Sequence, residues 1–209
     1  MQNDGGCMPS LRHTMLLPAV VASLALAGPA SAATSSSWTR TTVAHAGKDS
    51  VRAQADCAHA DSRPGEASEA ALAKSTVCLL NKQRARRGLR KLRQNARLSK
   101  AAQQHTIDMV KRNYFSHTSR SGADIVDRLS RTGYMRGARS WTVGENLAWG
   151  SGTRSPPRDI VAAWMRSPGH RSNILQRRFR EVGIGVVFAA PRSTRGVAAT
   201  YTTTFGARS

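Results

Sequence analysis

Helix-type patterns come first in this chain and strand-type patterns come last, and that order restricts the architecture more than any other feature of the sequence. Apolar residues recur at helical spacing between Ser68 and Gly133. Two strand-like runs, 182–188 and 197–205, close the chain. The order favours an α+β domain, in which helices flank an antiparallel sheet, over a parallel array of alternating strands and helices.

Start and stop signals divide the helical part into separate segments. Ser121 and Asp124 have the spacing of a capping box, and Gly88 and Gly133 lie where two of the helices should end. Helix starts are predicted near these residues: Ser68, Asn95, Ser121, Ser155 and Ser167. The glycine-bounded segment 141–150 is too short for a helix.

The first 32 residues (1–32) are expected to be a signal peptide. Arg12 and His13 form a polar start, residues 15–27 are almost entirely apolar, and Ala30 and Ala32 supply the small-residue pattern of a cleavage site. The apolar run is shorter than the roughly 20 residues that a membrane-spanning helix needs, and a retained N-terminal anchor is the alternative. No later segment is apolar enough to span a membrane, so a secreted, extracellular protein is predicted.

Residues 33–67 are rich in Ala, Ser, Thr and Asp and show no apolar period, so we expect a flexible linker there and a folded domain over 68–209. Cys57 and Cys78 remain after Cys7 leaves with the signal peptide. An even number of cysteines in an exported chain predicts a disulfide between them, worth about 3 kcal/mol in the chain-entropy model. Two free thiols are the alternative.

Positive charge dominates the composition. The chain has 32 Lys and Arg against 12 Asp and Glu, a net charge of +20 at pH 7, and no acidic residue lies between Glu69 and Asp108. Such charge attracts polyanions, and outside a cell these are polyanionic envelope polymers, an anionic lipid surface or extracellular DNA. Few aromatic residues interleave with the basic ones, so a stacking platform for single strands is not indicated. Sequence-specific nucleic-acid binding is not expected either. A solvated basic face without a specific partner is the alternative.

The sequence contains no nucleophile elbow, P-loop, dinucleotide fingerprint or H-E-x-x-H zinc motif. The remaining candidates for a binding cleft are His117 after an aromatic pair, Glu145 with Asn146 beside it, and His170 in the first turn of a predicted helix. Two imidazoles and one carboxylate can hold zinc or another divalent cation with a position open to water. The alternative gives each a local role: a loop histidine, a buried carboxylate that fixes a turn, and a helix-start residue.

His105 differs from these candidates because it lies on the apolar stripe of the second helix. A core histidine with its hydrogen bonds satisfied is therefore favoured over a ligand. Trp141, Trp149 and Trp164 are expected to fill the core with their indole N–H groups bonded.

Short motifs in one order point to a family. They are Tyr114-Phe115-Ser116-His117, Asp127-Arg128, Val143-Gly144-Glu145-Asn146-Leu147-Ala148, Ser167-Pro168-Gly169-His170-Arg171, Glu181-Val182-Gly183-Ile184-Gly185 and Tyr201 to Gly206. The most specific signal is Glu145-Asn146 followed by W-M-x-S-P-G-H-R-x-N-I-L. With these motifs, residues 75–206 resemble the CAP superfamily of cysteine-rich secretory proteins, antigen 5 and pathogenesis-related proteins, and within it the bacterial SCP-like extracellular branch.

The resemblance implies a three-layer α-β-α sandwich with a central antiparallel sheet, and a cleft with histidines and acidic residues. His117 and Glu145 match the family's first histidine and its G-E-N glutamate, and His170 matches the S-P-G-H-R position of the bacterial branch. The eukaryotic G-H-Y-T-Q motif supplies a second cleft histidine, but the corresponding run here, 199–203, is Ala-Thr-Tyr-Thr-Thr. That His170 replaces it as the second metal ligand beside His117 is a hypothesis.

Two functions follow as hypotheses. The first is a secreted non-enzymatic CAP-domain protein, a binding or defence-type module at the cell envelope or extracellular surfaces, with no catalytic residue. The alternative is a metal-dependent hydrolase of peptide or cell-wall material. Glu145 would then act as general base on metal-bound water, with His117 and His170 as ligands.

Overall fold

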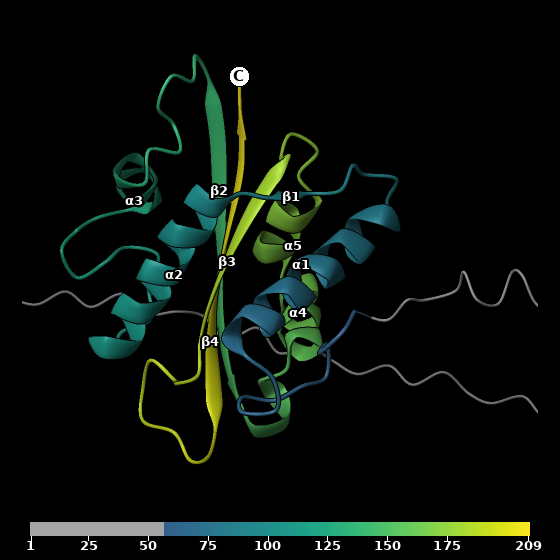
Figure 1. Ribbon diagram of the computed structural model, residues 1–209, viewed down its shortest axis with the longest axis vertical. Helices are drawn as coiled ribbons and strands as arrows, with labels where there is room; N and C mark the ends of the chain where they lie inside the picture. Colours follow the sequence, from purple (N-terminus) through teal and green to yellow (C-terminus); the bar gives the residue numbers. More distant parts are fainter. Residues whose placement is uncertain (1–56) are drawn as a thin grey trace, which may run out of the picture. The chain divides into compact units, whose positions relative to one another are not determined.

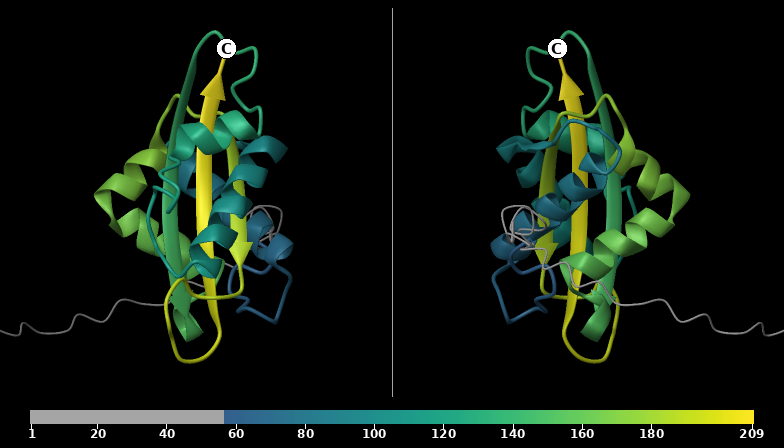
Figure 2. Two further views of the ribbon diagram at one scale, coloured as in Figure 1. Left: turned by 90° about the vertical axis from the view of Figure 1, so that its left-hand side faces the viewer. Right: turned by 90° about the vertical axis from the view of Figure 1, so that its right-hand side faces the viewer.

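A four-stranded sheet is the middle layer of the part of the chain that the computed structural model describes, residues 57–209. Its strands are β1 (Arg93–Gln94), β2 (Trp141–Ser151), β3 (Glu181–Val187) and β4 (Ala198–Arg208). Their spatial order is β1-β3-β4-β2, and Figure 2 shows β4 between β2 and β3. β4 runs antiparallel to both long neighbours, as the sequence predicts, whereas the two-residue β1 runs parallel to β3.

Helices cover both faces of this sheet, so the expected three-layer α-β-α sandwich is confirmed (Figure 1). One face carries α2 (Ala96–Lys111) and α3 (Ile125–Arg131), and the other carries α1 (Glu69–Ala85), α4 (Pro157–Arg166) and α5 (Pro168–Leu175). A 3-10 helix, η1 (Gly152–Arg154), joins β2 to α4. Within residues 57–209, no helix has the length and apolar character needed to cross a bilayer.

Helix α2 packs directly on the backbone of β3. A Cβ atom added at Gly183 or Gly185 would lie 2.1 Å or 2.5 Å from the helix backbone at Leu98 or Ala102. These distances are too short for any side chain, so glycine is required at both strand positions. The close approach of α2 to β3 therefore explains why glycines alternate in this part of the sequence.

Residues 57–67, the last part of the expected linker, pack against the folded domain. Cys57 and Ala60 are buried in the core, and Cys57 forms the predicted disulfide with Cys78. The carboxylate of Asp61 accepts two bonds from the Arg158 guanidinium, at 2.6 Å and 2.9 Å, which lower the pKa of Asp61. The expected signal peptide and the rest of the expected linker lie outside the residues that the structure describes.

Helix α3 begins three residues later than the Ser121 start that the sequence suggested. Its N-cap is Asp124, which forms a capping box with Asp127 through bonds of 2.9 Å and 3.1 Å. Gly122 has a φ of +85°, a left-handed conformation that a helix cannot contain, so Ser121 stays in the preceding turn. An aspartate pair therefore starts the helix.

The three tryptophans of the domain do not all fill the core as expected. Trp164 does, with 1% of its surface exposed and its indole N–H donating to the Leu147 carbonyl at 3.0 Å. Trp149 is half-buried, and Trp141 is 45% exposed, so the prediction for Trp141 is wrong. Trp141 is the first residue of β2, where the strand extends beyond the helical layers (Figure 1).

Side chains from two helices bond to the backbone at the end of β3 and at the residue that follows it. The Gln103 amide in α2 donates to the Val186 carbonyl and accepts from the Val186 N–H, both at 2.9 Å. The Glu69 carboxylate in α1 accepts from the Phe188 N–H at 2.9 Å. These side chains take hydrogen-bonding positions that a neighbouring strand would otherwise fill.

A buried arginine joins α1 to the segment between α5 and β3. Arg84 has no exposed surface, and its guanidinium donates to the backbone carbonyls of Arg90, Ile174, Gln176 and Phe179 at 2.8–3.3 Å. Burial, and secondarily a neighbouring arginine, lowers its pKa. Neutral carbonyl groups therefore solvate this cation.

Candidate functional site

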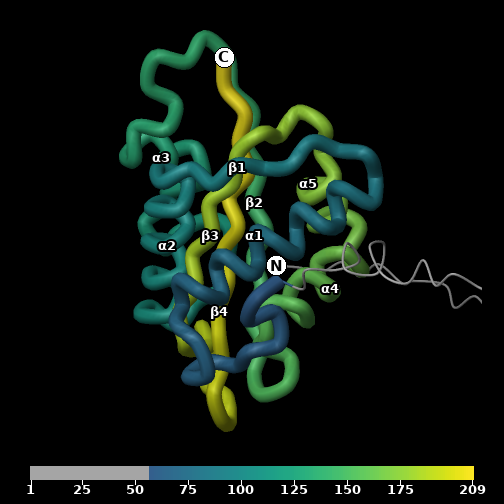
Figure 3. The backbone as a smooth tube through the Cα atoms, turned by 45° about the vertical axis from the view of Figure 1, so that its right-hand side comes forward, coloured from purple at the N-terminus to yellow at the C-terminus, as the bar shows by residue number. Residues whose placement is uncertain are grey.

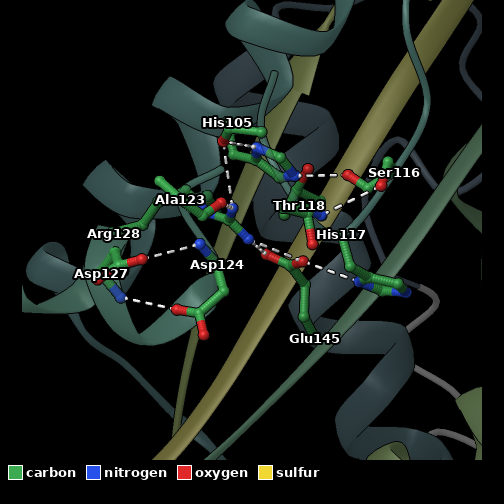
Figure 4. Close-up of polar contacts among 12 residues, drawn as sticks. His105, Ser116, His117, Thr118, Ala123, Asp124, Asp127, Arg128 and Glu145 are labelled. Atoms are coloured by element: carbon green, nitrogen blue, oxygen red, sulfur yellow. Dashed lines mark hydrogen bonds and ion pairs between the residues drawn. The ribbon is translucent and has the colours of Figure 1, made fainter. Parts of the chain in front are cut away.

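The candidate site is built around the carboxylate of Glu145 in the middle of β2. Its side chain is only 4% exposed, although it is charged. The guanidinium of Arg128 in α3 donates to both carboxylate oxygens, at 3.0 Å and 2.9 Å (Figure 4). A buried carboxylate requires such a partner, because an unpaired charge in the protein interior costs several kcal/mol.

Arg128 is itself fixed by its surroundings. Its other terminal nitrogen donates to the Ala123 carbonyl at 3.0 Å and the Ser119 hydroxyl at 3.3 Å. The Asp124–Asp127 capping box starts the helix that carries it. Sequence reasoning used Arg128 as a family marker and missed its place in the site. Its only sequence signal is its position directly after Asp127.

His117 reaches the same carboxylate from the loop between α2 and α3. Its Nδ1 lies 2.9 Å from Oε1 of Glu145 (Figure 4). A carboxylate accepts hydrogen bonds, so Nδ1 is the donor and, in the neutral ring, Nε2 keeps its lone pair. The His117 side chain is 59% exposed. The chain of hydrogen bonds that begins at the buried Arg128–Glu145 pair therefore reaches the surface at the His117 imidazole.

His105 holds the loop that presents His117. It is 1% exposed in α2, where burial lowers its pKa, and its Nε2 lies 3.0 Å from the Ser116 carbonyl. The expectation of a core histidine with a hydrogen-bond partner is confirmed. Because Ser116 precedes His117, this bond fixes the backbone next to the candidate site.

His170 is connected to Glu145 through two asparagines. Asn146 donates to the His170 carbonyl at 3.0 Å, and Asn173 donates to the Glu145 carbonyl at 3.1 Å and to the Asn146 side-chain oxygen at 2.9 Å. These bonds attach the start of α5 to the outer edge of β2. Asn173 is a second positioning residue that sequence reasoning did not single out.

The side chain of His170 does not bond to Glu145. Burial and the charge of His117 both lower the pKa of His170, so the two imidazoles are close enough to affect one another electrostatically. The structure thus brings His117 and Glu145 into contact and links His170 to them through its backbone.

The residues present do not fit a catalytic zinc site. Among residues 57–209, no three His, Cys, Asp or Glu side chains are placed to hold one ion. Both oxygens of Glu145 bond to Arg128, and Nδ1 of His117 is paired with Glu145. His117 and His170 alone fall short of the three protein ligands typical of catalytic zinc.

Two proteins of known sequence are similar to part of this chain. The chain is 38% identical over 120 residues to the uncharacterized protein YkwD of Bacillus subtilis, covering 57% of this chain and 44% of that protein. It is 33% identical over 113 residues to the uncharacterized membrane protein YlbC of the same organism, covering 54% and 31%. The match therefore spans less than half the length of either relative.

Two solved structures share the fold. An extracellular protein containing an SCP domain from Bacillus anthracis superposes with a TM-score of 0.54 at 29% identity, covering 66% of this chain and 40% of that one. An outer surface protein from Borrelia burgdorferi gives a TM-score of 0.51 at 20% identity, covering 64% and 90%. The family model described as CAP, the cysteine-rich secretory protein family, matches residues 77–204. The chain belongs to the CAP family.

Proposed function

We propose that this protein is an exported, non-enzymatic binding module that acts at the cell envelope or on another extracellular surface. The observation that carries the proposal is the state of Glu145, the carboxylate around which the candidate site is built. Its two oxygens bond to a buried guanidinium and one also bonds to His117.

A carboxylate held in this way is poorly suited to catalysis. A general base needs an accessible lone pair within reach of the proton that it takes up. Paired with Arg128 and 4% exposed, Glu145 instead stabilises its neighbours. The triad Arg128–Glu145–His117 therefore supports the presentation of one surface imidazole more than the activation of water.

Other features support an extracellular binding role. A polar start, an apolar run and an A-x-A pattern occupy the first residues, and Cys57 is bonded to Cys78, as suits an oxidising compartment. The net charge of +20 favours negatively charged partners. The similar structures include an extracellular protein and an outer surface protein.

Binding is tested by sedimenting the purified protein with isolated cell-envelope material over a range of salt concentrations. We expect the protein to co-sediment at about 0.15 M salt, where the Debye length is near 8 Å, and to be released as salt increases further. Complete loss of binding already at that ionic strength contradicts a physiological role driven by charge.

The non-enzymatic part is tested with the same material. Release of soluble peptides or sugars should be equal for the native protein and for Glu145→Gln, because no step depends on this carboxylate. Release that disappears in Glu145→Gln, with the variant shown to be folded by circular dichroism, overturns the proposal in favour of a hydrolase.

A further inference from the structure

Eight exposed basic side chains gather at one end of the domain and are called the arginine ridge. They are Arg86, Arg87, Arg90, Lys91, Arg93, Arg177, Arg178 and Arg180. Four come from the segment between α1 and β1, one is the first residue of β1, and three come from the segment between α5 and β3; Figure 3 shows these segments at the same end. The Arg93 N–H donates to the Arg180 carbonyl at 2.9 Å, so the two segments are in contact.

No acidic side chain neutralises the ridge. Within residues 57–209, none of its eight side chains forms an ion pair with Asp or Glu. The nearest acidic residue in sequence, Glu181, accepts bonds from Tyr134 at 2.8 Å and from Asn95 at 2.9 Å. Like charges held together without counter-charges repel one another, and a bound polyanion relieves this repulsion.

Hydrogen bonds hold the ridge in shape before any ligand arrives. Arg84 beneath it donates to the carbonyls of Arg90 and Phe179, one in each segment. A terminal nitrogen of Arg180 donates to the carbonyls of Arg177, Arg178 and Phe179 at 2.5–3.2 Å. The loop carbonyls are thus occupied by buried or local donors, and binding requires little ordering of the backbone.

A hollow of about 500 Å³ continues from one end of the ridge. It is lined by two ridge arginines, by a third arginine from β4, by hydroxyl groups and by an exposed indole. These residues are Arg178, Arg180, Arg208, Ser140, Thr142 and Trp141. Cations bind phosphate groups, and hydroxyl and indole groups suit the sugar or polyol units between them.

We propose that the arginine ridge, with this hollow at its end, binds a phosphodiester-linked glycopolymer, a chain in which anionic phosphates alternate with sugar or polyol units. The inference rests on the proposed function and assigns it a surface and a ligand class. A lipid bilayer fits this surface less well. The exposed large apolar residues in 57–209 are Trp141 and Val197, and only Trp141 adjoins the ridge. One partly exposed indole buries little apolar area in a membrane.

The test measures binding of soluble synthetic poly(glycerol phosphate) to the full chain by calorimetry. The ridge variant carries Arg86→Gln, Arg87→Gln, Arg177→Gln and Arg178→Gln. The control variant carries Lys111→Gln, Arg154→Gln, Arg192→Gln and Arg195→Gln, all exposed and away from the ridge. Both variants lose four positive charges. A difference in affinity between them therefore shows that the position of the charges matters, and not their number alone. We expect the ridge variant to bind at least about tenfold more weakly with a shallower salt dependence, and the control to stay within about threefold of the native chain.

Three results overturn the inference. Equal losses in both variants mean that net charge alone drives binding, and unchanged binding in the ridge variant means that the polymer binds elsewhere. Binding to phosphatidylglycerol vesicles but not to the soluble polymer makes a membrane the partner. Failure of the proposed function is distinguishable, because the native chain would then bind neither envelope material nor poly(glycerol phosphate) at any salt concentration.

Discussion

Arg84 and Arg128 are buried on opposite sides of the sheet and are held in opposite ways. Arg84, in α1, is surrounded by four backbone carbonyls from three segments and faces no carboxylate. Arg128, in α3, bonds to both oxygens of Glu145, whose charge it balances. One cation is solvated by neutral dipoles, and the other belongs to an ion pair that continues to a surface histidine.

The difference separates a structural group from a candidate functional one. The carbonyls around Arg84 include those of Ile174 and Gln176 at the end of α5, where the helix dipole favours a cation. That arrangement joins three segments and offers nothing to a ligand. Arg128 and Glu145 instead place His117 in a fixed orientation where solvent reaches it.

Among the substitutions considered below, replacing Arg84 should lower the free energy of unfolding the most. Arg84→Met removes the guanidinium that donates to four backbone carbonyls, so we expect the free energy of unfolding to fall by about 4 kcal/mol. Urea unfolding followed by circular dichroism measures it. Arg87→Met, at an exposed arginine just after the end of α1, is the matched control and should change stability by less than about 0.5 kcal/mol. A loss below about 1 kcal/mol for Arg84→Met would show that the carbonyls find other donors.

Arg128 and Glu145 should show a large interaction free energy, whereas Arg84 has no charged partner. Glu145→Gln leaves a buried cation without its counter-charge and should cost about 3 kcal/mol. The double variant Arg128→Met/Glu145→Gln should cost less than the sum of Arg128→Met and Glu145→Gln, because no unpaired charge remains. A double-mutant cycle by urea unfolding measures this. Strict additivity would mean that the ion pair does not stabilise the fold.

Buried His105 in α2 should also make the stability of the fold depend on pH. Burial lowers the pKa of His105 from its ordinary 6.5, so below about pH 6.5 the unfolded chain takes up a proton that the folded chain does not. Stability should therefore fall as pH decreases from 7.5 to 5.5, by at most about 1.4 kcal/mol per pH unit for one proton. Urea midpoints at several pH values test this. His105→Gln should flatten the profile, and an unchanged slope would assign the effect to His170, whose pKa is also lowered.

His117 should matter least for folding. Its side chain is 59% exposed, so His117→Ala should change the free energy of unfolding by less than about 0.5 kcal/mol. The Arg128–Glu145 pair should stay intact in this variant. Thermal and urea unfolding measure the effect. A loss above about 1.5 kcal/mol would make His117 part of the structural network and remove its role as the exposed end of the triad.

Local patterns predicted the elements better than they predicted the site. Helix starts at Ser68 and Asn95 were readable because capping depends on a few neighbouring residues. The short strand β1 could not be read, because Arg93–Gln94 pair with β3 only after the chain has folded back. The same holds for Arg128. A single arginine among 32 Lys and Arg carries no sign of burial until α3 is placed against β2.

The family motifs indicated His117, Glu145 and His170 as a group, but spacing could not say how they relate. The structure has Glu145 bonded to Arg128 and His117, while His170 takes part through its backbone carbonyl. Side-chain direction depends on tertiary packing, and no local pattern encodes it. A charge pattern is likewise one-dimensional, so joining the basic runs at 86–93 and 177–180 into one surface required the fold.

The side chains that bond to the outer strands have a consequence for how the molecule behaves among its own copies. The outer backbone of β3 at Val186 and of β2 at Glu145 and Leu147 is already bonded to helix side chains. A strand from another molecule would have to displace these groups before it could add to the sheet. A chain built this way can reach high local concentration on a surface without being drawn into fibres through its sheet edges.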